Sequence, residues 1–371
     1  MILLLAVVLI AFSFSVYWLL GKYFSIFKIN IKSLKFKIIR GSVAVLLVFL
    51  GFVFRILMLG LLHLLALWGF TEIFKHTFRR LIHRHRETKP YEIIRKVYKS
   101  GIAPILIIVI LFTYGYFNMN TIRQTSYTVS SEKLHNNYRI VFISDTHFGT
   151  IHDADTLKET VNEINELNPD LVILGGDIVE EGTDKTEMYE AFEILGDLNS
   201  TYGTYYVYGN HDRQRYTNEP EYTEWELADT IGKNGIKILR EEAVAISNDL
   251  LLVGREDLGS KDDRLQAEKL LVNIDNNRFI LVADHQPNNV ESNKEIGADL
   301  QISGHTHGGQ ILPLGLFPFL YNGCVYGKYQ TDNTTIIVSS GFAGWGFPIR
   351  TQGVSEYVVV ELKANEKGLS H

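Results

Sequence analysis

Gly-His-Thr-His-Gly-Gly-Gln occupies residues 304–310 and directly follows a short apolar run. Four other short polar blocks stand at the ends of apolar runs in the same way: Ser-Asp-Thr-His at 144–147, Gly-Gly-Asp at 175–177, Gly-Asn-His-Asp at 209–212 and Asp-His at 284–285. The blocks alternate carboxylate, imidazole and amide groups. Hard oxygen ligands mixed with borderline nitrogen ligands suit a pair of divalent transition metals better than a structural thiolate zinc site.

The spacing of these groups supports a metal site. Asp145 and His147 are two residues apart at the end of an apolar run, and His305 and His307 repeat that spacing. Because side chains alternate along a strand, residues two apart point the same way. Asp177 follows two glycines, where the backbone can turn sharply and leave the carboxylate accessible. Each residue alone is weak evidence, but the five blocks together predict a metal centre.

Charge and hydropathy divide the chain into two halves. Residues 1–118 contain 16 Lys and Arg against 3 Asp and Glu, a charge of +13. The other 253 residues contain 20 basic and 39 acidic groups, a charge of −19. A basic apolar half followed by an acidic half predicts a membrane anchor joined to a water-facing domain. The single cysteine, Cys324, excludes an internal disulfide framework and a cysteine-based metal cluster.

Three apolar stretches predict an all-α membrane region over residues 1–118. Residues 2–20 are uncharged, 43–70 are interrupted only by Arg55 and His63, and a third stretch runs from 102 to about 117. A helix over 43–70 would be about 42 Å long, whereas the hydrocarbon core is about 30 Å thick. We therefore expect three transmembrane helices, or four if 43–70 folds as two short spans.

The basic loops indicate the orientation. Loop 21–42 has six basic residues and no acidic one, and loop 71–100 has nine basic and three acidic residues. Both are typical of cytoplasmic loops. A hairpin over 43–70 places both loops inside and the domain outside. A single span weakly gives the same result through the more basic loop 71–100, although the lack of basic residues before the first span argues the other way. We expect a multi-pass cell-membrane protein with an extracytoplasmic domain.

A polar linker is predicted over 119–137 and an α/β domain over 138–371. Eight apolar runs are expected to be strands: 138–143, 171–174, 205–208, 250–253, 279–282, 300–302, 335–338 and 357–360. Helical spacing is found over 155–167, 186–198, 221–234 and 263–275. Strands alternating with helices predict layered α/β architecture with the site at the strand ends.

Residues 138–362 resemble the calcineurin-like metallophosphoesterases. That family's pattern is Asp-x-His, Gly-Asp, Gly-Asn-His-Asp/Glu, His and Gly-His-x-His, and every block is present. With its basic, multi-span N-terminal half, the whole chain resembles the family's membrane-anchored bacterial branch. The resemblance implies a β-sandwich flanked by helices, with a dinuclear metal centre at its rim.

The resemblance also implies a ligand set. The first metal would be bound by Asp145, His147 and His307, and Asp177 would bridge both metals. The second metal would be bound by Asn210, His285 and His305. Ligands of mixed nitrogen and oxygen type accept Mn, Zn or Fe, so the identity of the two divalent ions stays open.

Two cations about 4 Å apart can activate a bridging water and stabilise an in-line displacement at phosphorus. The expected function is therefore metal-dependent phosphoester hydrolysis. His211 is the predicted catalytic group that protonates the leaving oxygen or stabilises the transition state. Asp212 is expected to orient this loop, or alternatively to cap a helix. Arg350, in Pro-Ile-Arg at 348–350, is a candidate phosphate clamp or a structural ion-pair partner.

The substrate is expected to be a lipid-linked or membrane-proximal phosphoester or pyrophosphate, because a tethered site meets membrane substrates at high effective concentration. The charge of −19 argues against a nucleic-acid substrate. Alternatives are a non-catalytic membrane sensor of metal or phosphate, and a phosphodiesterase for soluble nucleotides. Trp345, Phe317, Phe319 and Tyr321 are expected to pack in the core, with an apolar lipid channel as the alternative, and His152 is expected at the surface. Oligomeric state is not fixed by the sequence.

Overall fold

The computed structural model of the chain describes residues 2–27, 33–77, 89–260, 264–266, 269–270, 277–321, 323–331 and 333–365. Two compact units are present, Met1–Thr113 and Tyr114–His371. They are described separately below.

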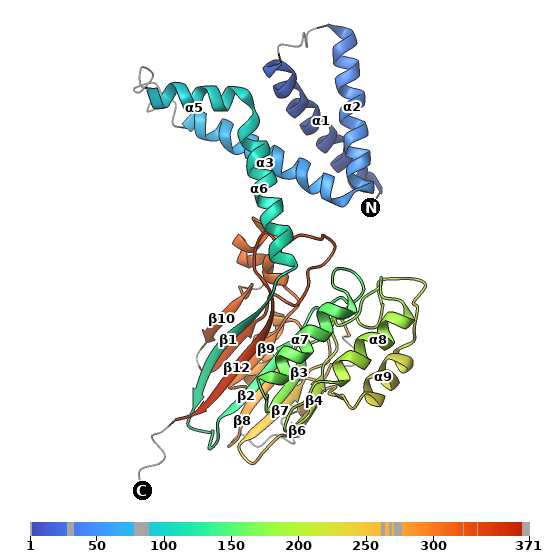
Figure 1. The fold of residues 1–371 in the computed structure, drawn as a ribbon, viewed down its shortest axis with the longest axis vertical. Helices are drawn as coiled ribbons and strands as arrows, with labels where there is room; N and C mark the ends of the chain where they lie inside the picture. Colours follow the sequence, from blue (N-terminus) through green and yellow to red (C-terminus); the bar gives the residue numbers. More distant parts are fainter. Residues whose placement is uncertain are drawn as a thin grey trace. The chain divides into compact units, whose positions relative to one another are not determined.

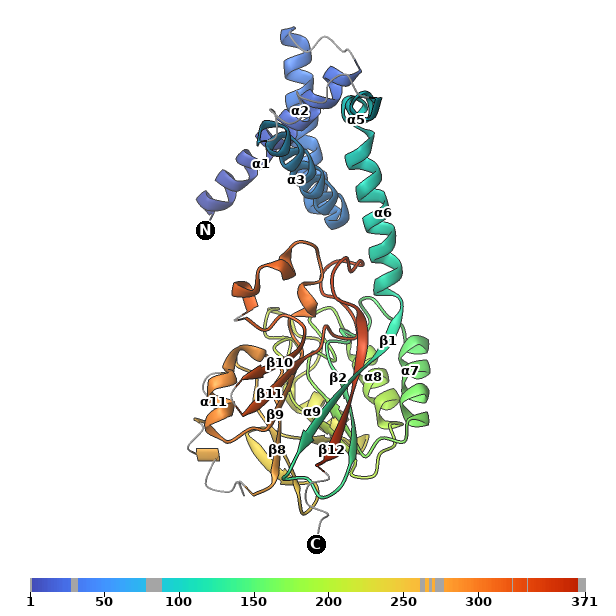
Figure 2. The same ribbon diagram turned by 90° about the vertical axis from the view of Figure 1, so that its left-hand side faces the viewer.

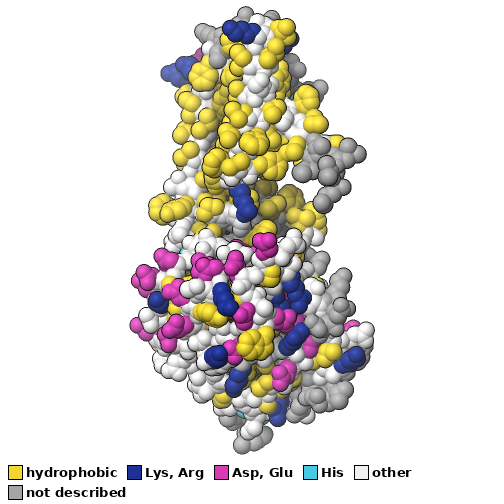
Figure 3. All heavy atoms as spheres, turned by 90° about the vertical axis from the view of Figure 1, so that its right-hand side faces the viewer, with side chains coloured by type: hydrophobic (Ala, Val, Ile, Leu, Met, Phe, Trp, Pro, Cys, Tyr) yellow, Lys and Arg dark blue, Asp and Glu magenta, His cyan; other side chains and the backbone are white. Residues whose placement is uncertain are grey.

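The first unit is built from long apolar helices (Figure 1). They are α1 (Ile2–Ile26), α2 (Leu34–Val53), α3 (Arg55–Thr77), the amphipathic α5 (Lys89–Ser100) and α6 (Ile102–Met119), whose last residues belong to the second unit. Among the described residues, four segments are long and apolar enough to cross a membrane: Val7–Ile26, Leu34–Val53, Arg55–Thr77 and Ile102–Met119. Apolar side chains cover the surface of these helices in the view of Figure 3.

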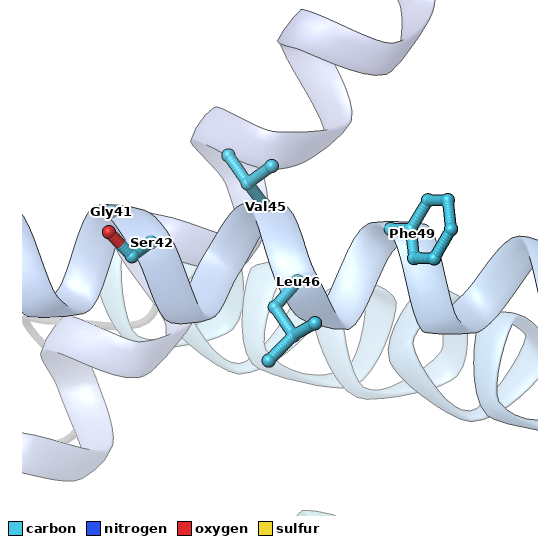
Figure 4. A pocket seen from close by; sticks show the side chains of 5 residues that line it. All are labelled: Gly41, Ser42, Val45, Leu46 and Phe49. Atoms are coloured by element: carbon cyan, nitrogen blue, oxygen red, sulfur yellow. The ribbon is translucent and has the colours of Figure 1, made fainter.

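The apolar run 43–70 therefore contains parts of two helices, as the four-span alternative predicted. Phe54 stands between α2 and α3 with extended backbone angles (φ −110°, ψ 90°), which interrupt the helical hydrogen bonding. A hollow on the surface of α2 is lined by Gly41, Ser42, Val45, Leu46 and Phe49 (Figure 4). These five residues carry no titratable side chain, so the hollow offers no chemistry for a reaction.

The second unit contains two six-stranded sheets (Figures 1 and 2). The first has the order β1-β12-β2-β3-β4-β5, and the second has the order β10-β11-β9-β8-β7-β6. The strands of the first sheet are β1 (Ile122–Ser131), β2 (Tyr138–Ile143), β3 (Leu171–Leu174), β4 (Thr204–Tyr206), β5 (Lys237–Ile238) and β12 (Ser355–Ala364). Those of the second are β6 (Glu242–Ala245), β7 (Leu250–Gly254), β8 (Phe279–Ala283), β9 (Leu300–Ser303), β10 (Gly327–Thr331) and β11 (Thr334–Val338).

The strand alternation explains the layers. On β2, Ile140 and Phe142 pack into a core shared by both sheets, whereas Val141 and Ile143 pack against the helices. Helices α7 (Ala154–Glu166), α8 (Lys185–Gly196) and α9 (Glu224–Lys233) contribute to that outer core. The short helix α11 (Val290–Glu295) follows the 3₁₀ turn η1 (Pro287–Asn289). The predicted β-sandwich flanked by helices is confirmed.

All eight predicted strands are found, and three of the four predicted helices correspond to α7, α8 and α9. Most of the fourth, 263–275, lies outside the described residues. Residues 122–131 were predicted to belong to a linker, but they form β1, which pairs in parallel with β12 along its whole length. Only Val129 of this strand is buried, so a largely polar edge strand has the hydropathy of a linker.

Strand direction places the end of α6 near the predicted site. Strands β2, β3 and β4 are parallel, β12 is antiparallel to β2, and β1 is parallel to β12. The beginning of β1 therefore lies at the same end of the sheet as the carboxyl ends of β2, β3 and β4. Since α6 ends at Met119, just before β1 begins at Ile122, this candidate span continues into the second unit at the end of the sheet where the Asp-Thr-His, Gly-Gly-Asp and Gly-Asn-His-Asp blocks follow the strands.

Candidate metal centre

The strand-end loops gather the predicted ligands into two clusters. The first cluster consists of Asp145, His147 and His307, and the second of Asp177, His285 and His305. In each cluster one potential ligand atom per residue lies within 4.8 Å of the others. The two clusters contain six of the seven residues expected as ligands; Asn210, expected beside His285 and His305, is in neither cluster, and Asp177 lies in the second.

Contacts between the loops bring the two clusters together. Nε2 of His285 lies 3.1 Å from Oδ2 of Asp177, and Nε2 of His307 lies 3.7 Å from Oδ1 of Asp145. The backbone N–H of His305 donates to both carboxylate oxygens of Asp145, at 2.9 and 3.2 Å. A member of the second cluster thus also holds the carboxylate of the first.

The backbone of the site is strained. Five of the seven predicted ligands have positive φ angles between 42° and 71°: Asp145, His147, Asp177, His305 and His307. A residue other than glycine in this region costs on the order of 1–3 kcal/mol, and such residues concentrate at functional sites. Close approach also requires glycine nearby. A Cβ on Gly304 would lie 2.3 Å from Oδ2 of Asp145, and one on Gly209 would lie 2.2 Å from Oδ1 of Asp177.

Backbone carbonyls orient two of the imidazoles. Nδ1 of His285 lies 2.8 Å from the carbonyl oxygen of Gly175, and Nδ1 of His307 lies 3.1 Å from that of Ala343. When Nδ1 donates its proton to a carbonyl, the Nε2 lone pair is left free to bind a cation. Oε2 of Glu180 lies 3.1 Å from Nδ1 of His147, a close contact of opposite polarity without hydrogen-bond geometry.

Unpaired polar atoms show that the donor set fits a metal. Nε2 of His147 and Oδ1 of Asn210 are buried, and within the described part of the chain neither has a hydrogen-bond partner. Nε2 of His285 is also buried, and its 3.1 Å contact with Oδ2 of Asp177 lacks hydrogen-bond geometry. Leaving a buried polar atom unpaired costs about 1–3 kcal/mol. These three atoms belong to predicted ligands, and a divalent cation bound by nitrogen and oxygen would satisfy all of them. We conclude that the residues fit a pair of divalent cations.

The electrostatics of His305, His307 and Asp177 favour the protonation states that bind metal. Burial lowers the pKa of His307 to about 3 and also lowers the pKa of His305, so both imidazoles are neutral at pH 7. Burial would raise the pKa of Asp177, but the neighbouring His285, His147 and His211 outweigh it and lower that pKa well below its ordinary value. Neutral imidazole and ionised carboxylate are the forms that ligate cations. At His285 burial is outweighed by the charge of Asp177, which raises the pKa well above its ordinary value, so this imidazole would release a proton on binding a cation.

Asp212 connects the loops of the second cluster. Its buried carboxylate accepts hydrogen bonds from four backbone N–H groups: Asp177 (2.9 Å) and Gly209 (2.6 Å) on Oδ2, and Ile178 (2.8 Å) and Val179 (3.3 Å) on Oδ1. These donors belong to two strand-end loops and not to the first turn of a helix. The geometry agrees with the predicted orienting role and not with a helix cap.

Arg350 does not occupy the position that a phosphate clamp requires. Its side chain is fully buried, and its guanidinium donates to backbone carbonyls of the first cluster's loops: His307 (2.9 Å), Ser340 (2.7 Å), Ala343 (2.6 Å) and Gly341 (3.5 Å). Burial lowers the pKa of Arg350 to about 10. The clamp is therefore corrected to a buried cation that holds the loop of His307. The sequence identifies an arginine at position 350 but not the direction of its side chain, which depends on the surrounding loops.

His211 lies beside both clusters. Its backbone N–H donates to Oδ1 of Asp177 at 2.8 Å, and its Nδ1 lies 2.6 Å from Oε2 of Glu181. Burial lowers the pKa of His211, but Glu181 and Asp177 outweigh this effect and raise it above its ordinary value. The exposed ring of Trp345 lies 5.6 Å from the imidazole, centroid to centroid.

Glu180 and Glu181 were not among the predicted site residues. Both follow the Gly-Gly-Asp block after two apolar residues, Ile178 and Val179, and each contacts an imidazole of the site. Their position after Asp177 was the available signal. Two other expectations are also corrected. His152 is buried against Phe342, and Phe317, Phe319 and Trp345 are exposed where core packing was expected. The side chain of Tyr321 lies outside the described residues.

Comparisons with known proteins agree with this geometry. The profile of the calcineurin-like phosphoesterase family matches residues 138–309. An uncharacterized metallophosphoesterase of Helicobacter pylori strain J99 is 33% identical over 236 residues, covering 62% of this chain and 61% of that protein. One from Aquifex aeolicus is 30% identical over 267 residues, covering 70% of this chain and 98% of that protein.

A zebrafish transmembrane protein with a metallophosphoesterase domain is 29% identical over 284 residues, covering 72% of this chain and 63% of that protein. The chain thus spans less than two thirds of the length of the Helicobacter and zebrafish relatives. The match to the Aquifex protein covers nearly all of it, and the family profile covers both the Asp-x-His and the Gly-His-x-His blocks. The chain therefore belongs to the calcineurin-like metallophosphoesterase family.

Proposed function

We propose that this protein is a membrane-bound phosphoesterase that needs two divalent cations and hydrolyses a phosphoester or pyrophosphate bond of a lipid-linked or membrane-proximal substrate. The observation that carries the proposal is the pair of ligand clusters, in which Nε2 of His147 and Nε2 of His285 are buried without a hydrogen-bond partner in the described part of the chain, as is Oδ1 of Asn210. When bound, two cations supply Lewis-acid activation of water and of the phosphoryl oxygens.

The ligand set divides between the clusters. Asp145, His147 and His307 would hold one cation, and Asn210, His285 and His305 the other. Asp177 would serve both, because its Oδ2 lies 3.1 Å from Nε2 of His285 in the second set and its charge also interacts with His147 of the first set. The strained, glycine-cleared loops keep these atoms in position before substrate arrives, which avoids reorganisation during the reaction.

His211 is the proposed acid. Glu181 holds its Nδ1, so the other ring nitrogen is free to donate a proton to the leaving oxygen. The raised pKa of His211 favours the protonated form that such an acid requires. A sensor that only binds metal or phosphate has no need of a proton donor held in this way, so the His211–Glu181 pair favours an enzyme.

The membrane location of the substrate is supported by topology. The candidate span α6 enters the soluble unit at the end of the sheets where the clusters lie. Four membrane crossings would also place both basic loops on one side and the soluble unit on the other. We propose that the basic loops are cytoplasmic and that the metal centre faces the extracytoplasmic side.

The test uses the full chain in lipid nanodiscs loaded with Mn²⁺ or Zn²⁺. A chromogenic phosphomonoester, a chromogenic phosphodiester, a phospholipid phosphoester and a soluble cyclic nucleotide are compared as substrates. We expect metal-dependent hydrolysis, with a turnover number lowered about 10²–10⁴-fold in His211→Ala while metal content is kept. The exposed His135 gives the matched control His135→Ala, which should be unchanged.

Metal bound without turnover on any substrate, including phospholipid phosphoesters, would overturn the enzyme proposal in favour of a sensor. Rapid hydrolysis of the cyclic nucleotide with no turnover on lipid phosphoesters would instead support a soluble-nucleotide phosphodiesterase.

A further inference from the structure

An exposed apolar segment stands beside the candidate metal centre. Residues 312–320 contain the 3₁₀ helix η3 (Leu314–Leu316) and begin η4 (Pro318–Tyr321). Six large apolar side chains in this segment are exposed to solvent, up to 75% for Phe319: Leu312, Leu314, Leu316, Phe317, Phe319 and Leu320. The sequence between residues 311 and 327 contains no charged residue. Apolar clusters of this kind on soluble surfaces mark contact sites.

The segment is fastened to the loop of residues 350–353. The N–H of Leu312 donates to Oγ1 of Thr351 at 2.8 Å, and the N–H of Gly315 donates to Oε1 of Gln352 at 3.2 Å. The N–H of Thr351 in turn donates to the carbonyl of Gln310 at 2.8 Å. These bonds give the apolar segment a defined place on the unit.

The same loop holds the last turns of α6. Nδ2 of Asn118 donates to the carbonyls of Arg350 (3.0 Å) and Gly353 (2.9 Å). The N–H of Arg350 donates to the carbonyl of Gly115 at 2.9 Å. Asn118 is buried by these contacts, so the end of a candidate membrane span and the apolar segment share one support. Figures 1 and 2 show both at the same end of the soluble unit.

We propose that residues 312–320 form an interfacial surface that inserts into the head-group region of the bilayer that α6 spans. The occupant is a lipid surface because the segment is uncharged and rich in Leu and Phe, and because it is hydrogen-bonded to the loop that receives a membrane-spanning helix. Insertion would add to the anchoring by the helices and would fix the rim of the metal centre at the membrane surface.

This placement specifies the substrate route. Arg350 also holds the carbonyl of His307, so the support that links α6 to the interfacial surface reaches a predicted metal ligand. A phosphate group on a lipid could then reach the clusters while its acyl chains stay in the leaflet. This part of the inference rests on the proposed phosphoesterase function, whereas the insertion itself does not.

Insertion is tested by spin-label depth measurements on the full chain in nanodiscs of phosphatidylethanolamine and phosphatidylglycerol. A label is attached at Phe319→Cys in a Cys324→Ser background, and a second protein carries it at Trp225→Cys. Trp225 is a matched control because it is a 72% exposed aromatic residue at the start of α9. We expect the label at 319 to collide more with oxygen than with a water-soluble nickel chelate, and the reverse at 225.

A label at 319 as accessible to the nickel chelate as the label at 225 would overturn the proposal. So would a label shielded from both reagents, which would indicate that a second copy of the chain or another protein covers the segment.

The substrate route is tested with two nitrophenyl phosphodiesters that differ only in alkyl chain length. Phe319→Asp combined with Leu316→Asp should lower hydrolysis of the long-chain ester in vesicles about tenfold or more, because insertion is lost. The double variant should hydrolyse the short, soluble ester at the unaltered rate. The control variant Trp225→Asp should hydrolyse both esters at the unaltered rate. Equal rates on the long-chain ester would refute the route. No turnover on either ester by the unaltered chain would refute the proposed function while the depth result stands.

Discussion

The two sides of the candidate metal centre are held by buried charges of opposite sign. Behind the second cluster, the carboxylate of Asp212 accepts hydrogen bonds from four backbone N–H groups of the loops at 177–179 and 209. Behind the first cluster, the guanidinium of Arg350 donates to four carbonyls of residues 307 and 340–343.

Both charged side chains satisfy backbone groups that would otherwise be buried without hydrogen-bond partners. Loops with positive φ angles cannot pair their backbone groups in a regular ladder, and burial makes an unpaired group costly. A charged side chain satisfies several such groups at once with strong hydrogen bonds. A charged residue in a sequence motif can therefore act by holding the backbone of the site, without contacting the substrate. Asp212 orients the loops of the second cluster, as expected. Arg350 holds backbone carbonyls and does not occupy the position expected of a phosphate clamp.

The largest effect is expected at Asp177, which serves both sides. Asp177→Asn removes the charge next to His285 and His211 and should lower turnover on the order of 10³-fold, equivalent to about 4 kcal/mol of transition-state stabilisation. Turnover and metal content per chain are measured together. Asp197→Asn changes an exposed aspartate and serves as the control. Full activity in Asp177→Asn would contradict a shared ligand.

A smaller effect, on metal affinity, is expected at Asp212, which supports the second cluster alone. Asp212→Asn turns one acceptor oxygen into a donor that faces backbone N–H groups. Groups that orient ligands typically change metal affinity about 10–100-fold, so we expect a loss of that size at the second cluster. Metal titration in a His307→Ala background, which disables the first cluster, should show the same loss. If Asp212→Asn no longer lowers metal affinity in the His307→Ala background, Asp212 supports the first cluster and the assignment to the second is contradicted.

The cation side should respond differently. In Arg350→Lys an ammonium cannot reach all four carbonyls, so we expect the free energy of unfolding to fall by about 1–3 kcal/mol. Affinity at the first cluster should fall about tenfold. Thermal unfolding and KM are measured on the full chain. A raised KM for phosphoester with unchanged stability would show instead that Arg350 binds the phosphate of the substrate.

The smallest effect concerns pH on the Arg350 side. Burial lowers the pKa of His152 to about 4, with the charge of Arg350 as a second cause. Between pH 6.5 and 4 the unfolded chain binds a proton that the folded chain does not, so stability falls as pH falls through this window. At pH 5.5 the cost is about 1.4 kcal/mol. Melting temperatures at pH 7.5 and 5.5 should therefore differ less in His152→Phe than in the unaltered chain, with His135→Gln as the control.

The sequence predicted what depends on local pattern. Apolar runs located the eight core strands, and the family blocks named the members of both clusters before their distances were known. Contacts between residues far apart in the chain could not be predicted from the sequence. The polar strand β1 needs β12 as a partner, Glu181 contacts His211 across 30 positions in the chain, and the direction of Arg350 depends on loops at 307 and 340–343. None of these contacts leaves a periodic signal in the sequence.

The most direct test of the central claim is the metal content of the purified full chain, followed through chelation and stepwise return of Mn²⁺. The account predicts that chelation abolishes phosphoester hydrolysis and that activity returns fully only as two ions bind per chain. Hydrolysis that survives complete removal of metal, or full activity with one ion per chain, would contradict it.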